Sequence, residues 1–314
     1  MLLFLRRMLN VAILSRGAGL YSTQSLFRAF RSREHYVRVI DHLRCNLVIE
    51  QGQPQVLYEG VPLLGMDVVV PRIGASATDY GVAVIRQFEQ MGIYTATRSE
   101  ALVLARDKLK CLQKLAAEGI AVPKTFAAGV IEDVPFILSK MDGMPIVIKL
   151  LESTHGVGVI LAESTGAAIA MAEAFFKLNQ PVLFQEFIAE SNGADIRAFV
   201  VGKKVVASMK RQAPEGEFRS NLHRGAEPSV EELTEEEEAI CVKSARLLGL
   251  NIAGVDLLRS NRGSLVMEVN ASPGLEGIET TTGIDIAGDI AQHVEAGVAK
   301  FLNRKPGANT DHSF

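Results

Sequence analysis

The sequence predicts an α/β protein that begins with a small doubly wound domain. Along the whole chain, short runs rich in Val, Ile and Leu alternate with stretches of helical periodicity, which is the pattern of strands connected by helices. The chain has 314 residues, enough for two or three folding units. Its residues are 48% hydrophobic and 22% charged, a composition typical of a globular protein with a substantial core.

The first hundred residues contain three apolar runs that are typical of buried parallel strands. The runs cover residues 11–14, 37–40 and 67–71. Residues 80–91 have the spacing of an amphipathic helix. We therefore predict a doubly wound N-terminal domain over residues 1–98.

The charge of the chain argues against direct nucleic-acid binding. The formal net charge is −3, whereas proteins that bind nucleic acid are usually clearly basic. Residues 1–100 differ from the rest because they hold eleven Arg, no Lys and eight acidic residues. This local excess of positive charge suits an acidic partner, but scattered surface arginines explain it at least as well.

Cysteine usage and hydropathy indicate a cytoplasmic protein without a membrane partner. Cys45, Cys111 and Cys241 are far apart in sequence, which argues against a disulfide framework or a zinc site and fits a reducing compartment. No apolar run reaches the roughly 20 residues that span a bilayer. At the start, arginines follow the apolar residues, the reverse of the order in a signal peptide. We expect translation to begin at Met8 and residues 1–7 to be an over-long start.

Residues 99–184 have the pattern of a second unit. A helix is predicted over residues 99–118, with Ser99 as its N-cap and Gly119 just after its C-terminus. The other predicted elements are strands at residues 146–150, 157–162 and 182–188 and a helix at residues 166–178.

Residues 185–304 form a predicted third unit, and residues 305–314 have the composition of a disordered tail. Six glutamates between positions 231 and 238 fit the solvated first turn of a helix, where negative charge suits the helix dipole. The predicted elements are strands at residues 196–201 and 205–210, a helix at 229–248, a hairpin at 254–270 and a helix at 285–302.

The hairpin carries the clearest candidate metal site. If the three residues 261–263 form its loop, Asp256 falls opposite Glu268. Asn270 lies two residues after Glu268 and therefore on the same face of its strand. Carboxylate and amide oxygens are hard ligands that suit Mg²⁺ or Mn²⁺. Because both acids sit within apolar runs, a metal is favoured over the alternative of a solvent-facing polar strand surface.

Two lysines and a glycine-containing loop are candidate phosphate-binding features. Lys149 ends an apolar strand, and the loop that follows it includes Gly156, whose neighbouring N–H groups can close over phosphate oxygens. Lys108, on the predicted helix, can supply a second positive charge, although a solvated lysine is the simpler interpretation. The sequence contains no P-loop, and the Gly-Ala-Gly run at 17–19 lacks the third glycine of a dinucleotide fingerprint.

A candidate adenosine site follows at residues 185–188, Gln-Glu-Phe-Ile, at the end of a predicted strand. Backbone amides there can meet an adenine edge, and an acidic side chain such as Asp195 can accept hydrogen bonds from ribose hydroxyls. Taken alone, this signal has low specificity.

Taken in order, these features resemble the ATP-grasp superfamily, and several longer blocks resemble its RimK family over about residues 9 to 303. The resemblance implies that the N-terminal domain precedes a two-lobed ATP-grasp fold, with an N-lobe at 99–184 and a metal-binding C-lobe at 185–304. The blocks are Pro71-Arg72-Ile73-Gly74, Ala105-Arg106-Asp107-Lys108, Gly156-Val157-Gly158-Val159, Asp195-Ile196-Arg197, residues 218–225 and residues 267–288.

The resemblance also implies roles for individual residues. The phosphates of ATP would be held by Lys108, Lys149 and Gly156. Adenosine would be bound by Glu186, Phe187 and Asp195. The residues over the triphosphate and reacting centre would be Arg219, Ser220 and Asn221. Two Mg²⁺ or Mn²⁺ ions would be bound by Asp256, Glu268 and Asn270. The candidate catalytic residues are Arg219, Asn221 and Arg224. The guanidinium groups of the two arginines suit an acyl phosphate or a substrate carboxylate.

RimK-like ligases add glutamate to the C-terminus of small-subunit ribosomal protein six and can join glutamates to one another. The resemblance therefore implies ATP, free glutamate and that C-terminal tail as reactants, an acyl-phosphate intermediate, and a possible homotetramer. Two departures from the family pattern, His155 and Ala226, leave the acceptor open. The alternatives are a ligase acting on another peptide or carrier protein, and a non-catalytic ATP-binding regulator, against which the complete set of candidate metal ligands argues.

Overall fold

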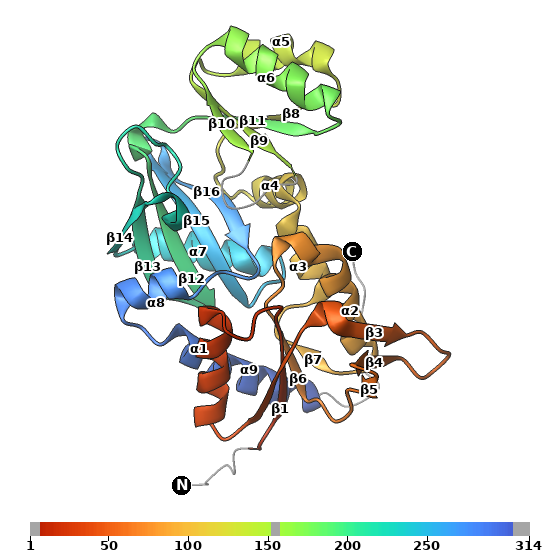
Figure 1. The fold of residues 1–314 in the computed structure, drawn as a ribbon. Coiled ribbons are helices and arrows are strands. Elements are labelled where there is room, and N and C mark those ends of the chain that lie inside the picture. Colours follow the sequence, from red (N-terminus) through yellow and green to blue (C-terminus); the bar gives the residue numbers. More distant parts are fainter. Residues whose placement is uncertain (1–6, 152–157, 304–314) are drawn as a thin grey trace. The chain divides into compact units, whose positions relative to one another are not determined.

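The structure is a computed structural model that describes residues 7–151 and 158–303 (Figure 1). The chain divides into two compact units. The first unit comprises Met1–Glu100, Gly274–Glu276 and Asp285–Phe314, and the second comprises Ala101–Pro273 and Gly277–Ile284.

Three of the sequence predictions concern residues outside the described ranges. They are the over-long start, of which residues 1–6 are not described, the phosphate loop with Gly156 and His155, and the tail at 305–314. These stay predictions.

The first unit is built on a parallel four-stranded sheet, as the sequence predicts. In spatial order, its strands are β2 (Tyr36–Ile40), β1 (Asn10–Leu14), β6 (Val68–Pro71) and β7 (Tyr94–Thr95). From β1 the chain proceeds to one edge of the sheet, and from β6 it proceeds to the other. The order of the strands therefore reverses between β1 and β6, which is the arrangement of a doubly wound sheet.

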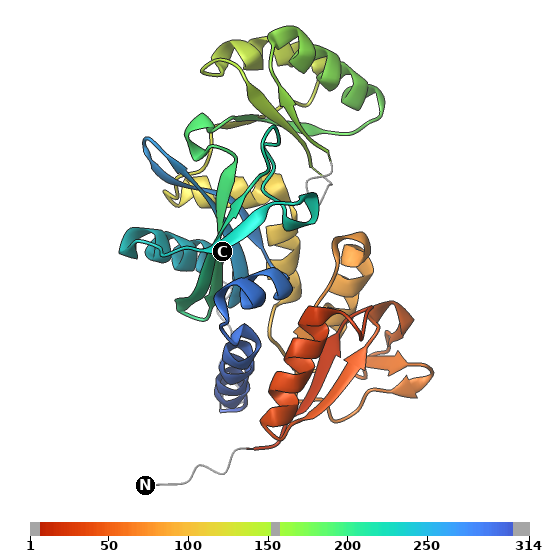
Figure 2. The same cartoon turned by 60° about the vertical axis from the view of Figure 1, so that its left-hand side comes forward.

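Three helices accompany this sheet: α1 (Tyr21–Ser32), α2 (Thr78–Gln90) and α9 (Ile286–Leu302). Helices α1 and α9 lie side by side (Figures 1 and 2). Arg33, the C-cap of α1, forms an ion pair with Glu295 of α9, with 2.7 Å between Nε and Oε1. This contact joins the C-terminal helix to the first unit, whereas the sequence-based boundary groups it with the C-lobe.

A small antiparallel sheet in the first unit has no counterpart in the sequence predictions. It consists of β3 (Cys45–Val48), β4 (Gln55–Tyr58) and β5 (Val61–Pro62). Gln87 of α2 joins the sheet to that helix, because its Nε2 donates to the carbonyl oxygen of Val48 over 2.7 Å. These strands are short and mostly only partly buried, so they lack the apolar run that marks a buried strand.

The second unit begins with an antiparallel sheet in the order β10 (Val159–Ala162), β9 (Ile146–Leu150), β11 (Val182–Glu186) and β8 (Thr125–Ala127). Helices α5 (Val134–Lys140) and α6 (Thr165–Lys177) lie together on one face of it (Figures 1 and 2). Ile146 and Ile148 pack into that core with Ala168 and Ala172. Because side chains alternate along a strand, Lys149 points to the other face.

The single helix predicted over residues 99–118 is two helices, α3 (Ser99–Arg106) and α4 (Lys108–Ala117). Asp107 separates them because its backbone is extended and its carboxylate accepts a hydrogen bond from the backbone N–H of Lys110, capping α4. Ser99 is the first helical residue, and its hydroxyl donates to Glu89 over 2.6 Å. Gly119 follows the second helix with φ of +73°, as predicted.

The larger sheet of the second unit has five antiparallel strands. In spatial order they are β14 (Glu227–Val230), β13 (Lys204–Gln212), β12 (Ala194–Val201), β15 (Ile252–Ser260) and β16 (Gly263–Asn270). Helix α7 (Glu235–Leu247) packs against four of them, and α8 (Glu276–Thr282) follows the sheet. The helix predicted over residues 229–248 therefore starts later, because Thr234 and Glu237 form a capping box and the preceding residues belong to β14.

In the hairpin of β15 and β16, the predicted pairing of Asp256 with Glu268 is present, but it is not produced by the predicted loop. Asp256 does lie opposite Glu268. The loop, however, has two residues rather than three, since Ser260 pairs with Gly263. A bulge beside Asp256 supplies the extra residue at Met267 and restores the register.

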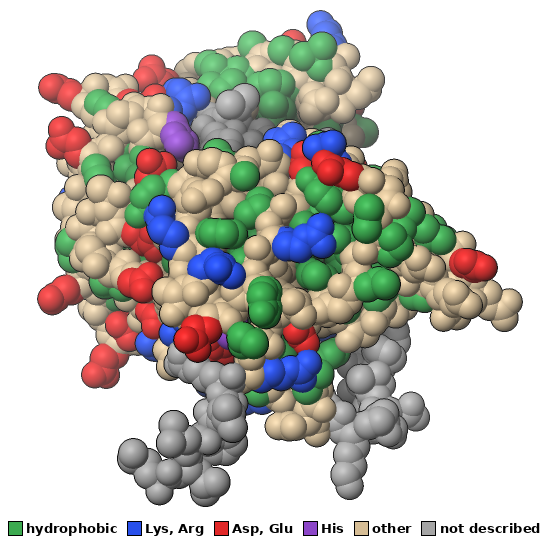
Figure 3. Space-filling model, turned by 60° about the horizontal axis from the view of Figure 1, so that its bottom comes forward, with side chains coloured by type: hydrophobic (Ala, Val, Ile, Leu, Met, Phe, Trp, Pro, Cys, Tyr) green, Lys and Arg blue, Asp and Glu red, His purple; other side chains and the backbone are tan. Residues whose placement is uncertain are grey.

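Figure 3 shows how the Lys and Arg side chains are distributed on one face of the molecule. On the face drawn in Figure 3, most Lys and Arg side chains stand apart among hydrophobic and uncharged residues. That face fits scattered surface arginines better than a continuous basic patch.

Among residues 7–151 and 158–303, no helix has both the length and the apolar character that a bilayer crossing requires.

Candidate active site

Six polar side chains share one face of the β13–β12–β15–β16 part of the larger sheet. Residues directly opposite on antiparallel strands point the same way, and so do residues two apart on one strand. Arg211 lies opposite Asp195, Arg197 opposite Asp256, and Asp256 opposite Glu268. We call this set the polar row: Asp195, Arg197, Arg211, Asp256, Glu268 and Asn270.

The polar row lies on the face of the sheet away from α7. Arg259 and Ser264 are opposite each other on β15 and β16, and both donate hydrogen bonds to Glu237 of α7. Arg259 therefore points toward that helix. Asp256 is an odd number of residues away on the same strand, so it points to the opposite face.

Two carboxylates of the row are buried and held by two arginines. Asp195 is 3% exposed and Asp256 is 2% exposed. Arg211 donates from Nε and Nη2 to the two oxygens of Asp195, each over 2.6 Å, and its Nη2 is also 3.1 Å from Oδ2 of Asp256. Arg197 forms a second bidentate pair with Asp256, with 2.7 Å between Nη2 and Oδ2. Each charge is thus compensated within the row, as burial requires.

The surroundings shift the pKa values of the two acids in opposite directions. Burial raises the pKa of Asp195. The guanidinium group of Arg211 lowers this pKa and the negative charge of Asp256 raises it, and the net pKa is above the ordinary value. Burial would also raise the pKa of Asp256, but the guanidinium groups of Arg197 and Arg211 outweigh it and hold the pKa below its ordinary value. Asp256 is therefore the carboxylate of the pair that stays ionised most readily.

The predicted metal ligands lie next to the predicted phosphate ligands. The charge of Glu268 acts on both Lys149 and Lys108, raising their pKa values against the stronger lowering effect of burial. For Lys149, the net result is a pKa of about 8. Lys108 donates from Nζ to the carbonyl oxygen of Leu150 over 2.9 Å, next to Lys149 in sequence. The structure thus gathers groups from α4, β9 and β16 in one place.

Only one of the two candidate metal-binding acids is buried. Asp256 is buried, as its apolar neighbours predict, but Glu268 is exposed. The Nδ2 of Asn270 is 3.4 Å from Oδ2 of Asp256. In the described part of the chain, no group of three His, Cys, Asp or Glu side chains is placed to hold a metal. Two carboxylates and one amide nevertheless fit Mg²⁺, which takes few protein ligands when phosphates complete its shell.

The segment at residues 217–225 reaches the polar row through Ser220, whose side chain hydrogen-bonds Asp195. Arg219 donates from Nε and Nη2 to the carboxylate of Glu217 over 2.9 and 2.7 Å, and from Nη1 to the carbonyl oxygen of Val159 over 3.3 Å. Hydrogen bonds from Arg219 lower the pKa of Glu217 to about 2. Arg219 thus links this segment to β10.

The other two members of the predicted segment are more open. Asn221 is half-buried, and Arg224 is exposed at the end of the segment's short 3₁₀ turn. A side chain at Gly277 of α8 would collide with the end of Leu222, whose Cδ1 is 2.3 Å from an ideal Cβ position. The glycine therefore allows the segment to pack closely on α8.

The predicted adenosine ligands lie where β11 ends. Glu186 accepts a hydrogen bond from the backbone N–H of Lys124 over 2.6 Å and pairs with Arg262 at the tip of the β15–β16 hairpin. The ring of Phe187 meets that of Phe218 edge-on, with 6.3 Å between centroids. Phe187 therefore borders the 217–225 segment, while Asp195 lies in the polar row.

Three residues of the site were not among the predicted site residues: Arg197, Arg211 and Glu217. The sequence does carry a signal for Arg211, because it continues the alternation of Ala207 and Met209, both of which are buried. A buried arginine requires a carboxylate partner. Glu217 lacks any comparable pattern, and only the fold of its segment brings it onto Arg219.

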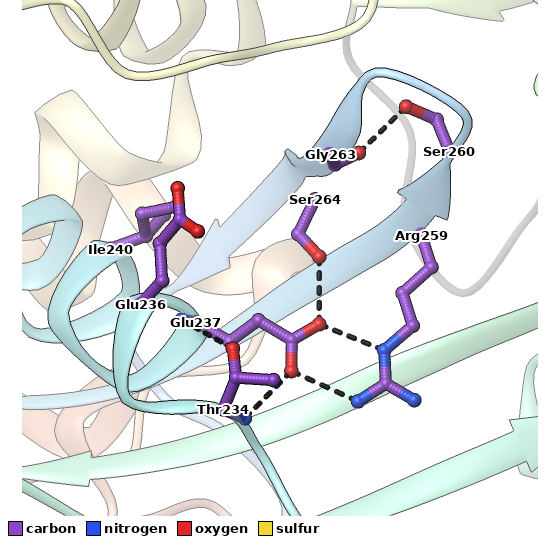
Figure 4. Close-up of a pocket in the computed structure, with 8 residues that line it drawn as sticks. All are labelled: Thr234, Glu236, Glu237, Ile240, Arg259, Ser260, Gly263 and Ser264. Carbon is purple, nitrogen blue, oxygen red and sulfur yellow. Dashed lines mark hydrogen bonds and ion pairs between the residues drawn. The ribbon is translucent and has the colours of Figure 1, made fainter.

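A pocket of about 270 Å³ near the start of α7 belongs to a separate, structural cluster (Figure 4). Glu237 accepts hydrogen bonds from Nε of Arg259 over 2.8 Å, from Oγ of Ser264 over 2.7 Å and from the backbone N–H of Thr234 over 3.0 Å. The hydrogen bonds from Arg259 are the main reason that the pKa of Glu237 is lowered to about 2. These groups satisfy one another and fasten α7 to the hairpin.

Models of two protein domains match nearly the whole chain. The RimK PreATP-grasp domain matches residues 9–102, and the RimK-like ATP-grasp domain matches residues 105–294. A probable alpha-L-glutamate ligase of Ectopseudomonas mendocina (strain ymp) is 54% identical over 299 residues, covering 95% of this chain and 97% of that protein. A probable alpha-L-glutamate ligase of Vibrio cholerae serotype O1 (strain M66-2) is 53% identical, covering 95% and 99%.

Solved structures of other ATP-grasp proteins share the fold at low sequence identity. The RimK domain protein ATP-grasp from Sphaerobacter thermophilus has a TM-score of 0.69 and 22% identity, covering 91% of this chain and 99% of that one. The D-alanine–D-alanine ligase from Bacillus anthracis, complexed with ATP, has a TM-score of 0.67 and 17% identity, covering 93% and 98%. The predicted ATP-grasp fold with an N-terminal pre-ATP-grasp domain is thereby confirmed. The chain belongs to the RimK-like ATP-grasp family and is an ATP-dependent carboxylate–amine ligase.

Proposed function

We propose that this ligase joins glutamate to the carboxyl end of a peptide or protein, and that its acceptor is the C-terminal tail of small-subunit ribosomal protein six. The choice of glutamate is supported by the relatives named as probable alpha-L-glutamate ligases. The acceptor follows from the resemblance to RimK-like ligases in the motifs of the sequence. The geometric observation behind the proposal is the polar row with two lysines beside it.

In this proposal, ATP lies between the strand lysine and the polar row. Lys108 and Lys149 would neutralise phosphate charge, and the backbone N–H groups at Gly156 would donate hydrogen bonds to phosphate oxygens. The partly depressed pKa of Lys149 still leaves it mostly protonated at neutral pH. Glu186, Phe187 and Asp195 would bind adenosine. The segment with Arg219, Ser220 and Asn221 would cover the triphosphate, because Arg219 already contacts the strand that follows the phosphate loop.

Asp256, Glu268 and Asn270 would hold two divalent ions, Mg²⁺ or Mn²⁺. Bound there, such ions would supply charge neutralisation for the β- and γ-phosphates. The two arginines on Asp256 keep its carboxylate ionised and oriented toward the open face of the sheet. The ligand set is thus pre-formed at Asp256, while the exposed Glu268 is free to adjust its rotamer.

The reaction needs positioning and charge compensation rather than a covalent enzyme intermediate. A carboxylate oxygen of the acceptor attacks the γ-phosphorus, and the bond from that phosphorus to the β,γ-bridging oxygen breaks, which gives an acyl phosphate and ADP. The amine of glutamate then attacks the acyl carbon, phosphate leaves, and the amine loses a proton as the amide forms. Arg219 and Arg224 would clamp the acyl phosphate or a substrate carboxylate, since guanidinium groups match both.

Intact-mass spectrometry tests this proposal. The purified protein is incubated with ATP, Mg²⁺ and glutamate, with and without ribosomal protein six. We expect mass steps of one glutamyl residue on that protein, and ADP release that depends on glutamate. ADP release without a mass step would move the acceptor to another peptide or to free poly-glutamate, and no ADP with glutamate would contradict the glutamate assignment.

A further inference from the structure

We propose that a pocket in the first unit, where the strand order reverses between β1 and β6, binds a carboxylate of an acidic peptide. This site lies outside the polar row, and its assignment to the acceptor rests on the proposed glutamate-ligase function. The pocket measures about 390 Å³ and is lined by Ser15, Arg16, Gly17, Leu20, Arg72 and Gly74.

The position of the pocket is the one at which open parallel sheets bind ligands. Its residues follow directly after β1 and after β6, at the carboxyl ends of these two neighbouring strands (Figure 1). Loops that leave a sheet in opposite directions open a crevice at this point. Arg16 and Arg72 lie in separate stretches of the sequence, and the fold brings them to the same crevice.

The charge in the pocket suits an anion. Two of its six lining residues are arginines and none is acidic. Arg16 donates from Nη2 to Oγ of Ser76 over 2.9 Å and forms no ion pair with any residue in the described part of the chain. Its exposed guanidinium therefore keeps donors for a ligand carboxylate, and guanidinium groups bind carboxylates in a bidentate manner.

The N-terminus of helix α1 adds positive potential to the pocket. Helix α1 starts immediately after Leu20, which provides no capping side chain, and the first turn of the helix has no acidic residue. The positive end of the helix dipole is thus not neutralised by its own first turn. Gly74 lies beside Arg16, because an ideal Cβ at this glycine would be in ordinary contact with Nη2 of that arginine, at 3.7 Å.

The apolar side of the pocket indicates which carboxylate fits. Leu20 is 61% exposed and folds back over Gly17, where an added Cβ would meet its Cγ at 2.6 Å. An exposed leucine beside two arginines matches an aliphatic stem that ends in a carboxylate, as in a glutamyl side chain. The volume of the pocket also falls in the range of about 300 to 1,000 Å³ that is typical of ligand pockets, so one or more glutamyl residues can enter.

Equilibrium binding of tri-α-glutamate to the full-length protein, measured by calorimetry without ATP, tests the pocket. Arg16→Gln and Arg72→Gln should each weaken binding by about tenfold, and the double variant more. Arg38→Gln is the matched control, because Arg38 is an exposed arginine of the same unit on β2 and does not line the pocket. Thermal melting of each variant verifies that the first unit remains folded.

Three outcomes would overturn the inference. They are unchanged affinity in the Arg16 and Arg72 variants, equal binding of tri-glutamine, and displacement of the peptide by low concentrations of inorganic phosphate, which would point to a phosphate site. Failure of the proposed glutamate-ligase function would give a different result in these experiments. Arginine-dependent peptide binding without glutamate-dependent ADP release would leave the pocket in place and remove the glutamate assignment.

Discussion

Asp256 and Glu268 lie directly opposite each other on β15 and β16 because a bulge, not the hairpin loop, supplies one extra residue. Without that residue, Met267 would oppose Asp256, and Glu268 would point to the face that packs on α7. The bulge therefore decides whether the second predicted metal ligand belongs to the polar row. Bulges near active sites commonly re-aim a side chain in this way.

Replacing Glu268 by alanine should abolish ATP turnover and leave the protein folded. The side chain is exposed, so its loss should change the free energy of unfolding by only about 0.5 kcal/mol. ADP release should fall by at least about 100-fold, since a metal ligand provides several kcal/mol of charge stabilisation. The exposed Glu236→Ala variant, remote from the row on α7, should keep parental turnover. Substantial ADP release by Glu268→Ala would refute the metal assignment.

Replacing Lys149 by methionine should weaken ATP binding far more than it weakens the fold. The stem of the side chain can be replaced by an apolar chain of similar length, whereas the positive charge that meets phosphate cannot. We expect an ATP dissociation constant raised by about 10- to 100-fold and a change of less than about 1.5 kcal/mol in unfolding free energy. Titration with ATP and denaturant unfolding measure the two effects. Parental ATP affinity in this variant would remove Lys149 from the phosphate site.

Replacing Arg211 by methionine should strongly destabilise the second unit. Arg211 compensates two buried carboxylates, Asp195 and Asp256, and its removal leaves buried negative charge without its main partner. Breaking such a pair costs about 3 to 5 kcal/mol. Urea unfolding monitored by circular dichroism measures this loss. The exposed Arg246→Met variant on α7 is the control, and equal stability of the two variants would show that the pair is not needed for folding.

Glu237 should make the stability of the protein depend on acid pH. Its pKa is lowered to about 2 from an ordinary value of 4.5, so the ionised form stabilises the folded state above about pH 4.5. Because solvent screens the pair with the half-exposed Arg259, this contribution is on the order of 1 to 3 kcal/mol, and it should disappear as the pH falls from about 4.5 to about 2. Unfolding free energies of the parent and of Glu237→Gln, measured across this range, should differ at pH 7 and converge toward pH 2. A difference that does not change with pH would contradict the assignment.

Periodicity and motif order in the sequence are enough to predict the class of fold. The parallel strands of the first unit, the strand that carries Lys149 and the hairpin with Asp256 all appear as apolar runs, because buried strands need them. The family also follows from local blocks, because those blocks combine residue types that packing alone does not require. The positions of short strands such as β3 and β5 do not follow, since they bury few side chains.

Only the tertiary structure decides how the charges of the site are compensated. Arg211 and Asp195 are 16 residues apart, and Arg197 and Asp256 are 59 apart, so no local pattern pairs them. The order of strands in the sheet brings them into register, and burial then makes each pair necessary. The same holds for Arg16 and Arg72, which meet only because β1 and β6 are neighbours. The sequence by itself thus determined the buried strands and the chemistry of the site residues, while long-range strand pairing decided which charges share a site.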